Sequence, residues 1–225
     1  GYMVRILERW WDERTYKGRN YSDVFQRHRS EACSRHLHQI VINKLHTTQS
    51  MRNTKSHASP MTTLTSPHDL LAAIPFLVGF KPEDSIVLMS IKDDSIFMAL
   101  RIDFPDSLDP EQIDTLVSHL QRDDADAAIS VYYIPESSSD ADLLIKTITD
   151  AIDEKKIPLR ESLIVHANRW RSLMCEDLEC CPPEGSPLPE LDHSRIAAEQ
   201  VALGKPVPFE NINQLVKFGG LKNLE

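Results

Sequence analysis

Apolar and polar positions repeat with two different periods from Ser66 onward, and these periods separate helices from strands. Ser66 is a favourable N-cap, Pro67 suits the first helical turn and Gly79 suits the end of a helix, so a helix is predicted between them. After Asp109, apolar residues recur every three or four positions, which is typical of an amphipathic helix. The predicted helices cover residues 67–78, 109–120, 140–155, 194–202 and 210–218.

Shorter apolar runs that are bounded by turn residues predict strands. These runs cover residues 85–90, 95–104, 127–134, 162–167 and 170–174. The turn at Asp93 and Asp94 joins the first two strands as an antiparallel hairpin, and the alternation of strand and helix that follows is typical of right-handed parallel crossovers. We therefore predict an α/β fold, a mixed sheet with an N-terminal antiparallel hairpin and parallel strand–helix–strand crossovers, with helices packed on the sheet.

Charge divides the chain near residue 60. Residues 1–60 hold 11 Lys and Arg against 5 Asp and Glu, whereas residues 61–225 hold 14 against 29. Because Met61 offers a natural start, we expect residues 1–60 to be a basic N-terminal segment that is poorly ordered or non-native. The alternative is a basic arm with interleaved aromatic residues that contacts nucleic acid. We expect residues 61–225 to be an acidic α/β domain.

Several classes of function lose support from the sequence. An acidic domain repels phosphate backbones, so residues 61–225 are predicted not to bind nucleic acid. The longest apolar run, residues 70–80, is far shorter than the roughly 20 residues of a bilayer-spanning helix, so no membrane association is expected. Neither an export signal nor a secreted disulfide framework is evident, and we expect a cytoplasmic protein.

Familiar catalytic and nucleotide-binding motifs are also missing. Glycine does not occur between residues 80 and 184, so the sequence has no phosphate-cradling loop or dinucleotide turn where the crossovers begin. It has no Gly-x-Ser-x-Gly elbow and no His-Glu-x-x-His pair either. These absences weaken the case for nucleotide and hydrolase chemistry and leave a protein partner as an open option.

The segment CEDLECCPPEG carries three of the four cysteines, Cys175, Cys180 and Cys181. One interpretation is a metal site, in which Cys175 and one of the neighbouring pair join His166 or His193 around zinc. Another is a redox thiol or a Cys175–Cys180 bridge. The favoured interpretation is that these small side chains are buried and fix a Pro-rich turn. In each case we expect at most two of the three to share a ligand or bond.

A second candidate site is the crevice beyond the carboxyl ends of the parallel strands, where ligands bind in open α/β sheets. The candidate ligand-binding residues there, with the neighbouring tryptophan, are Asp103, Glu136, His166, Asn168, Arg169 and Trp170. A carboxylate, a histidine and an arginine at one rim suit a polar metabolite or acid–base work. The alternative, which we favour, is that these are ordinary polar loop ends.

Two stretches, LLAAIPFLVGFKPEDSIVLM at residues 70–89 and RWRSLMCEDLECCPPEGSPLP at residues 169–189, resemble the actinobacterial domain of unknown function 4192 family. RIDFP and AAEQVALGK extend the resemblance over residues 64–215. The signature positions that the resemblance implies are Asp84, Ser85, Arg101, Asp103, Arg169, Trp170, Cys175, Cys180, Cys181, Glu184 and Gly185. It implies no activity or substrate. Since members continue with a further helical region, residues 61–225 are expected to be C-terminally truncated.

Two hypotheses of function remain. The favoured one is a non-catalytic binding or regulatory module, because the sequence shows no nucleophile–base pair and no cofactor loop. The alternative is a small-molecule enzyme that uses the strand-end crevice, with the cysteine cluster as a metal or redox element. A pocket in which the crevice residues meet a cysteine would favour the enzyme.

Overall fold

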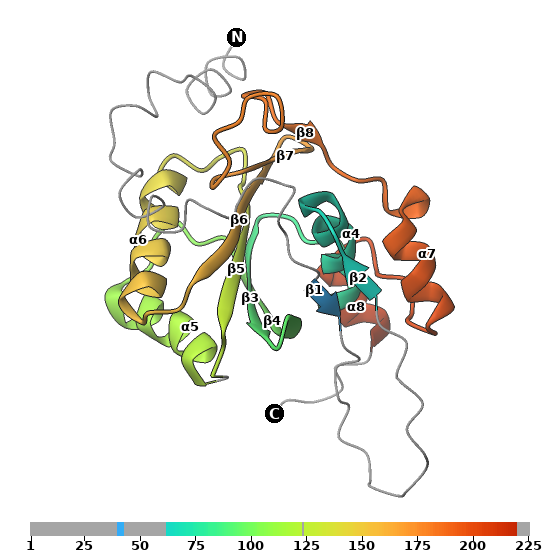
Figure 1. The fold of residues 1–225 in the computed structure, drawn as a ribbon, viewed down its shortest axis with the longest axis horizontal. Helices are drawn as coiled ribbons and strands as arrows, with labels where there is room; N and C mark the ends of the chain where they lie inside the picture. Colours follow the sequence, from blue (N-terminus) through green and yellow to red (C-terminus); the bar gives the residue numbers. More distant parts are fainter. Residues whose placement is uncertain (1–39, 43–61, 123, 220–225) are drawn as a thin grey trace, which may run out of the picture.

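The computed structural model describes residues 40–42, 62–122 and 124–219, and eight strands among them form one mixed sheet (Figure 1). The strands are β1 (Ile40–Ile42), β2 (Thr62–Leu64), β3 (Ser85–Lys92), β4 (Ser95–Asp103), β5 (Ala127–Tyr133), β6 (Leu159–His166), β7 (Arg169–Ser172) and β8 (Ser186–Pro187). Their order across the sheet is β2-β1-β4-β3-β5-β6-β7-β8. The predicted α/β fold class is confirmed.

Helices cover both faces of the sheet (Figure 1). They are α4 (Pro67–Val78), α5 (Pro110–Arg122), α6 (Ala141–Glu154), α7 (Arg195–Ala202), α8 (Ile212–Gly219) and the 3₁₀ turn η1 (Leu191–His193). Helices α5 and α6 pack on one face, and α4 and α7 lie on the other. All five predicted helices are present with shifts of a few residues at their ends.

The hairpin of β3 and β4 turns at Asp93 and Asp94, whose φ angles of 50° and 57° are those of a type I′ turn. Strand β3 then lies between β4 and β5 and pairs antiparallel with both. The crossover through α5 therefore passes over β3, whereas α6 connects the directly paired parallel strands β5 and β6. As a result β4, β5 and β6 end at the same edge of the sheet.

Alternation along β5 distributes its side chains between two cores. Ile129 and Val131 pack on the α4 side, while Ala128 and Tyr132 pack against α5 and α6. Tyr133, the last residue of the strand, continues the α4-side series. Its ring is therefore directed to the α4 face at the edge where the parallel strands end.

Helix α4 begins and ends as its sequence predicts. The Ser66 hydroxyl accepts a hydrogen bond of 3.1 Å from the Asp69 N–H. At the other end Gly79 has a φ of 90°, and its N–H donates to the Pro75 carbonyl over 2.8 Å. These caps fix the helix that forms one wall of the pocket described below.

Strand β1 comes from the segment that the charge division places outside the domain. It pairs antiparallel with β2 and parallel with β4. The remainder of residues 1–60 lies outside the described residues, so the domain boundary at residue 60 stays a prediction. The pairing of β1 with β2 and β4 is the observation that argues against a boundary there. Within the described ranges, no helix has the length and apolar character needed to cross a membrane.

Candidate functional site

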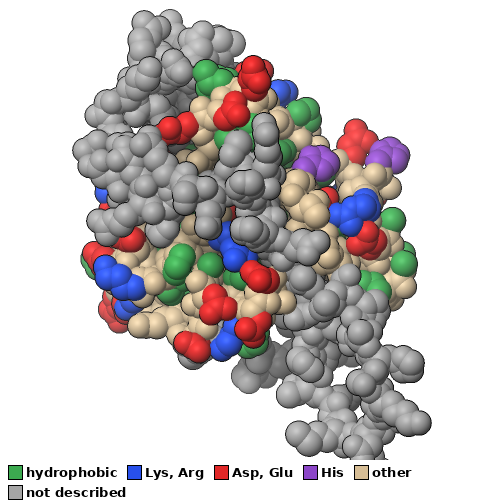
Figure 2. Space-filling view, viewed as in Figure 1, with side chains coloured by type: hydrophobic (Ala, Val, Ile, Leu, Met, Phe, Trp, Pro, Cys, Tyr) green, Lys and Arg blue, Asp and Glu red, His purple; other side chains and the backbone are tan. Residues whose placement is uncertain are grey.

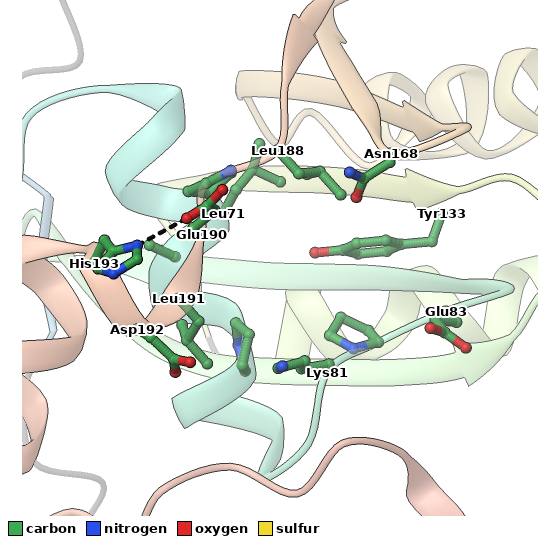
Figure 3. A pocket seen from close by; sticks show the side chains of 14 residues that line it. Leu71, Lys81, Glu83, Tyr133, Asn168, Leu188, Glu190, Leu191, Asp192 and His193 are labelled. Carbon is green, nitrogen blue, oxygen red and sulfur yellow. Dashed lines mark hydrogen bonds and ion pairs between the residues drawn. The ribbon is translucent and has the colours of Figure 1, made fainter.

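A pocket of about 440 Å³ opens at the carboxyl ends of the parallel strands, on the α4 face of the sheet (Figure 3). Its walls come from four segments that are distant in sequence. Leu71 belongs to α4, Lys81 to the loop before β3, Tyr133 to the end of β5, and Leu188 to the segment after β8. The volume falls in the usual range for small-molecule sites. The strand-end crevice that the sequence predicts is therefore present as a hollow in the surface.

Tyr133 lies at the centre of this pocket, with its hydroxyl pointing toward the η1 side (Figure 3). The residue is only 7% exposed, and its hydroxyl has no hydrogen-bond partner among the described residues. Burial raises the pKa of this hydroxyl, so the phenol keeps its proton and can donate. Because the Tyr133 side chain faces the hollow, a ligand that enters the pocket can reach this hydroxyl.

Asn168 supplies a second polar group to the pocket wall. It forms the tight turn between β6 and β7 together with Ala167, with φ angles of 60° and 48° respectively. The Asn168 carbonyl accepts a hydrogen bond of 3.1 Å from the Leu188 N–H, which joins the turn to the segment after β8. The sequence predicts Asn168 as a ligand-binding candidate, and its side chain lies beside the Tyr133 ring (Figure 3).

The charged groups around the pocket are mainly acidic. Glu83, Glu190 and Asp192 line it, against the single lysine Lys81. The Lys81 ammonium donates to both carboxylate oxygens of Glu210, over 2.9 and 2.8 Å, so its charge is already compensated. The pocket therefore presents a field that favours positive charge.

His193 lies at the pocket rim rather than beside the cysteines. Its Nδ1 is 2.8 Å from Oε2 of Glu190, and the His193 side chain is 81% exposed. The sequence proposes His193 as one of two histidines that could join the cysteines around a metal, but the group of metal-ligating side chains found in the described part of the chain holds the three cysteines alone. The structure thus places this histidine in the pocket wall.

Two of the strand-end candidates, Asp103 and Glu136, are exposed and outside the pocket lining. Asp103 pairs with Arg101, whose guanidinium also lies over the Phe80 ring at 5.5 Å. Arg101 further donates to the Glu83 carbonyl over 3.4 Å. Arg101 and Asp103, two of the positions implied by the resemblance, thus support the loop that leads into β3.

The three remaining candidates, His166 at the end of β6 and Arg169 and Trp170 in β7, also have local roles. Nδ1 of His166 lies 3.2 Å from the Ile134 carbonyl oxygen. The Arg169 guanidinium donates to the carbonyls of Glu184 and Gly185, through Nε over 2.6 and 3.1 Å. Trp170 is buried in the α4-side core. The structure therefore does not bring Asp103, His166 and Arg169 together around one reacting centre.

The three cysteines meet in the loop between β7 and β8. The Sγ atoms of Cys175, Cys180 and Cys181 all lie within 4.8 Å of one another, and each residue is half-buried. Burial raises the pKa of the Cys175 and Cys181 thiols. The sequence predicts that at most two of them share a ligand or bond, but this geometry lets all three reach one ion. None of them lines the pocket.

A second hollow of about 390 Å³ lies on the opposite face, between β4 and α5. Its lining combines the apolar Leu100, Ile102 and Leu108 with charged residues at the N-terminal end of α5. The strand-end pocket is the stronger candidate because it combines the Tyr133 hydroxyl with charged groups from several segments.

Sequence reasoning missed Tyr133, Lys81, Glu83 and Glu190. A signal for Tyr133 was present, because it ends a buried strand at the edge where ligands bind and alternates in phase with Ile129 and Val131. The other three depend on how distant loops fold back onto α4, and no local pattern reveals this.

Comparison with models of known families matches residues 67–216 to the family described as Domain of unknown function (DUF4192). No curated protein and no solved structure matches the chain. The matched residues include α4, the hairpin, both crossovers, the cysteine loop and every pocket residue named above.

Proposed function

The chain belongs to the DUF4192 family, whose description assigns no activity, and from this premise we propose that it is a non-catalytic binding module for a small organic cation. The ligand occupies the strand-end pocket. Its ammonium group interacts with the acidic rim, and a hydrogen-bonding group meets the Tyr133 hydroxyl. The proposal rests on the site, because neither the fold class nor the family description names a ligand.

The observation that carries the proposal is the Tyr133 hydroxyl. It points into a hollow of about 440 Å³ from a residue that is only 7% exposed, and no described residue bonds to it. A direct hydrogen bond from this hydroxyl to a ligand contributes about 0.5–1.5 kcal/mol. A ligand that accepts its hydrogen bond gains this energy, and the Asn168 amide beside it adds a donor and an acceptor.

Charge determines the class of ligand. Glu83, Glu190 and Asp192 surround the opening, and the Lys81 ammonium is engaged by Glu210. An ammonium ion is therefore favoured over a phosphate or a carboxylate. Acidic side chains lie over the visible face of the molecule, interspersed with Lys and Arg (Figure 2). The excess of 29 acidic over 14 basic residues in residues 61–225 disfavours the approach of anions.

Apolar side chains provide contacts for the body of the ligand. Leu71, Leu188 and Leu191 line the pocket together with Pro75 and Pro82. These apolar side chains share the lining with polar and charged ones, so the pocket suits a ligand that has both an apolar and a polar part. The ligand that this combination suits is a primary amine with a short apolar or aromatic body.

Binding is favoured over catalysis by what lines the pocket. Its described lining includes no serine, threonine or cysteine, and the three clustered cysteines lie elsewhere. The His193 and Glu190 pair is at the exposed rim, where water is not excluded. The arrangement that the enzyme hypothesis requires, crevice residues converging with a cysteine, is not the one observed.

A matched pair of probes tests the proposal. Tyramine and 4-hydroxyphenylacetate share an aromatic body and differ in the sign of their charge. Each is titrated into the full chain with labelled leucine methyl groups, and the methyl resonances of Leu71, Leu188 and Leu191 are followed. The proposal expects tyramine to shift these resonances saturably and the carboxylate to leave them unchanged. Equal shifts with both probes, or none with tyramine, would contradict it.

A further inference from the structure

The spacing of the cysteine sulfurs is close to that of a metal-bound set. The Sγ atoms of Cys175, Cys180 and Cys181 lie within 4.8 Å of one another, and none of them is in a disulfide bond. Three thiolates around one Zn²⁺ ion, with Zn–S distances of about 2.3 Å, are about 3.8 Å apart in a tetrahedral site. Small side-chain rotations therefore suffice to close the set around an ion.

The backbone of the loop holds this arrangement in place. Oδ1 of Asp177 accepts from the N–H groups of Glu179 and Cys180, over 2.9 and 3.4 Å. The Asp177 carbonyl accepts from the Cys181 N–H over 2.7 Å. These bonds form a turn that returns the neighbouring cysteines to Cys175.

The far end of the loop is held as well. The Gly185 N–H donates to the Pro182 carbonyl over 2.8 Å, and Gly185 has a φ of 71°. The Arg169 guanidinium then binds the carbonyls of Glu184 and Gly185. Because both flanks are held before any ion binds, little ordering is left to oppose binding.

We propose that Cys175, Cys180 and Cys181 bind one Zn²⁺ ion, with a water molecule as the fourth ligand. Each thiol transfers its proton to solvent as its sulfur bonds to the ion, so that full binding releases three protons and leaves a complex with one negative charge. Thiolate ligands select Zn²⁺ over Mg²⁺ and Ca²⁺, which prefer oxygen. The site lies outside the strand-end pocket and does not depend on the function proposed for it.

The electrostatics of the cluster agree with this assignment. Burial raises the pKa of Cys175 and of Cys181, and the neighbouring sulfurs add to the cost of three thiolates in one place. A divalent cation removes both obstacles, since it neutralises the thiolates as they form. Binding should therefore weaken as the pH falls, because protons compete for the same sulfurs.

The test begins with the full chain, reduced and stripped of metal, which is titrated with Co²⁺ as a spectroscopic substitute for Zn²⁺. The expected result is one Co²⁺ per chain, with thiolate-to-cobalt charge-transfer bands and the visible bands of tetrahedral cobalt. Zn²⁺ should displace the cobalt and abolish these bands. A chain that shows no such bands, or whose cluster is oxidised to a disulfide in reducing buffer, would overturn the proposal.

Single serine variants identify the ligands. Cys175→Ser, Cys180→Ser and Cys181→Ser should each lower the Zn²⁺ affinity by about tenfold or more. The matched control is Cys33→Ser, which removes the fourth cysteine of the chain and should bind Zn²⁺ as the unaltered protein does. Affinity that depends on Cys33, or that survives all three cluster variants, would show that the ion binds elsewhere.

A measurement on the unaltered chain keeps the test decisive if the variants fail to fold. Zn²⁺ should protect Cys175, Cys180 and Cys181 from alkylation by iodoacetamide, as mapped by mass spectrometry, while Cys33 remains a reference thiol in the same digest. Equal alkylation of the three cluster thiols with and without Zn²⁺ would contradict the site.

Discussion

The hydroxyl of Ser172 donates a 2.7 Å hydrogen bond to Oε1 of Glu161, and both residues are buried. The Ser162 N–H donates to the same oxygen over 2.8 Å. Burial raises the pKa of Glu161 to about 7, and the two hydrogen bonds only partly oppose this effect. The buried carboxyl group of Glu161, on the α4 face of the sheet, therefore changes its charge near neutral pH.

This pKa predicts how the stability of the fold depends on pH. The folded chain holds the Glu161 proton more tightly than the unfolded chain between the ordinary pKa of 4.5 and about 7. The contribution of this group to stability is therefore highest below that window, and it falls by about 3 kcal/mol as the pH rises through it. Glu161→Gln keeps the Oε1 acceptor and cannot ionise, so the variant should lack this fall.

Thermal unfolding at pH 5 and pH 8 measures the effect. The drop in melting temperature between the two should be smaller in Glu161→Gln than in the unaltered chain. Glu136→Gln removes an exposed carboxylate instead and serves as the control, with an unchanged drop. If the two variants respond alike, Glu161 does not titrate in this range.

Arg169 should stabilise the cysteine loop through geometry as well as charge. Its guanidinium reaches the carbonyls of both Glu184 and Gly185, whereas a lysine ammonium in its place cannot reproduce this fork. Arg169→Lys should therefore cost about 1–3 kcal/mol in the free energy of unfolding. Chemical denaturation measures this cost.

The matched control for this change is Arg160→Lys. Arg160 pairs with the exposed carboxylate of Asp94, and surface pairs of this kind contribute at most about 1 kcal/mol. If Arg169→Lys lowers the free energy of unfolding by no more than Arg160→Lys does, the loop does not depend on the paired hydrogen bonds of the Arg169 guanidinium.

Much of the fold could be predicted from the sequence because its signals are local. Ser66 and Gly79 mark the ends of α4, and the apolar periods place the other helices and the longer strands. Strand β1 has three residues and β8 has two, which is too short for any period to appear. The position of β3 between β4 and β5 is set by hydrogen bonding between strands that are distant in sequence, and neither the helical nor the strand period of apolar residues encodes it.

The candidate site was predictable only as a location. The strand-end rule identifies the edge of the sheet at which this pocket lies, but of the six crevice candidates only Asn168 lines the pocket. His166 ends β6 and Arg169 begins β7, and both bond instead to nearby carbonyls. Which polar side chain faces a cavity is decided by how distant segments come together, as η1 and α4 do in lining this pocket.

Removing residues 1–60 tests the domain boundary. A chain that starts at Met61 lacks β1, but α7 still holds β2, because Gln200 donates to the Thr62 hydroxyl over 2.7 Å and Arg195 to the Thr63 carbonyl over 3.1 Å. The melting temperature should therefore fall by less than about 5 °C, which corresponds to roughly 1–2 kcal/mol for a domain of this size. A larger fall would place the boundary before β1.

The same shortened chain should not bind nucleic acid. Its 29 acidic residues against 14 basic ones oppose contact with phosphates. Fluorescence anisotropy with labelled duplex DNA and single-stranded RNA should show no change at micromolar protein and low salt. Salt-sensitive binding in this range would contradict the prediction.

The affinity of Tyr133→Phe for tyramine tests the central claim most directly. The hydroxyl makes no hydrogen bond within the described structure, so its removal should leave the melting temperature of the full chain unchanged within about 2 °C. If the hydroxyl serves the ligand, the loss of one hydrogen bond should weaken tyramine binding by about 2- to 12-fold, as measured by calorimetry. Equal affinity in the two proteins would contradict the proposed site.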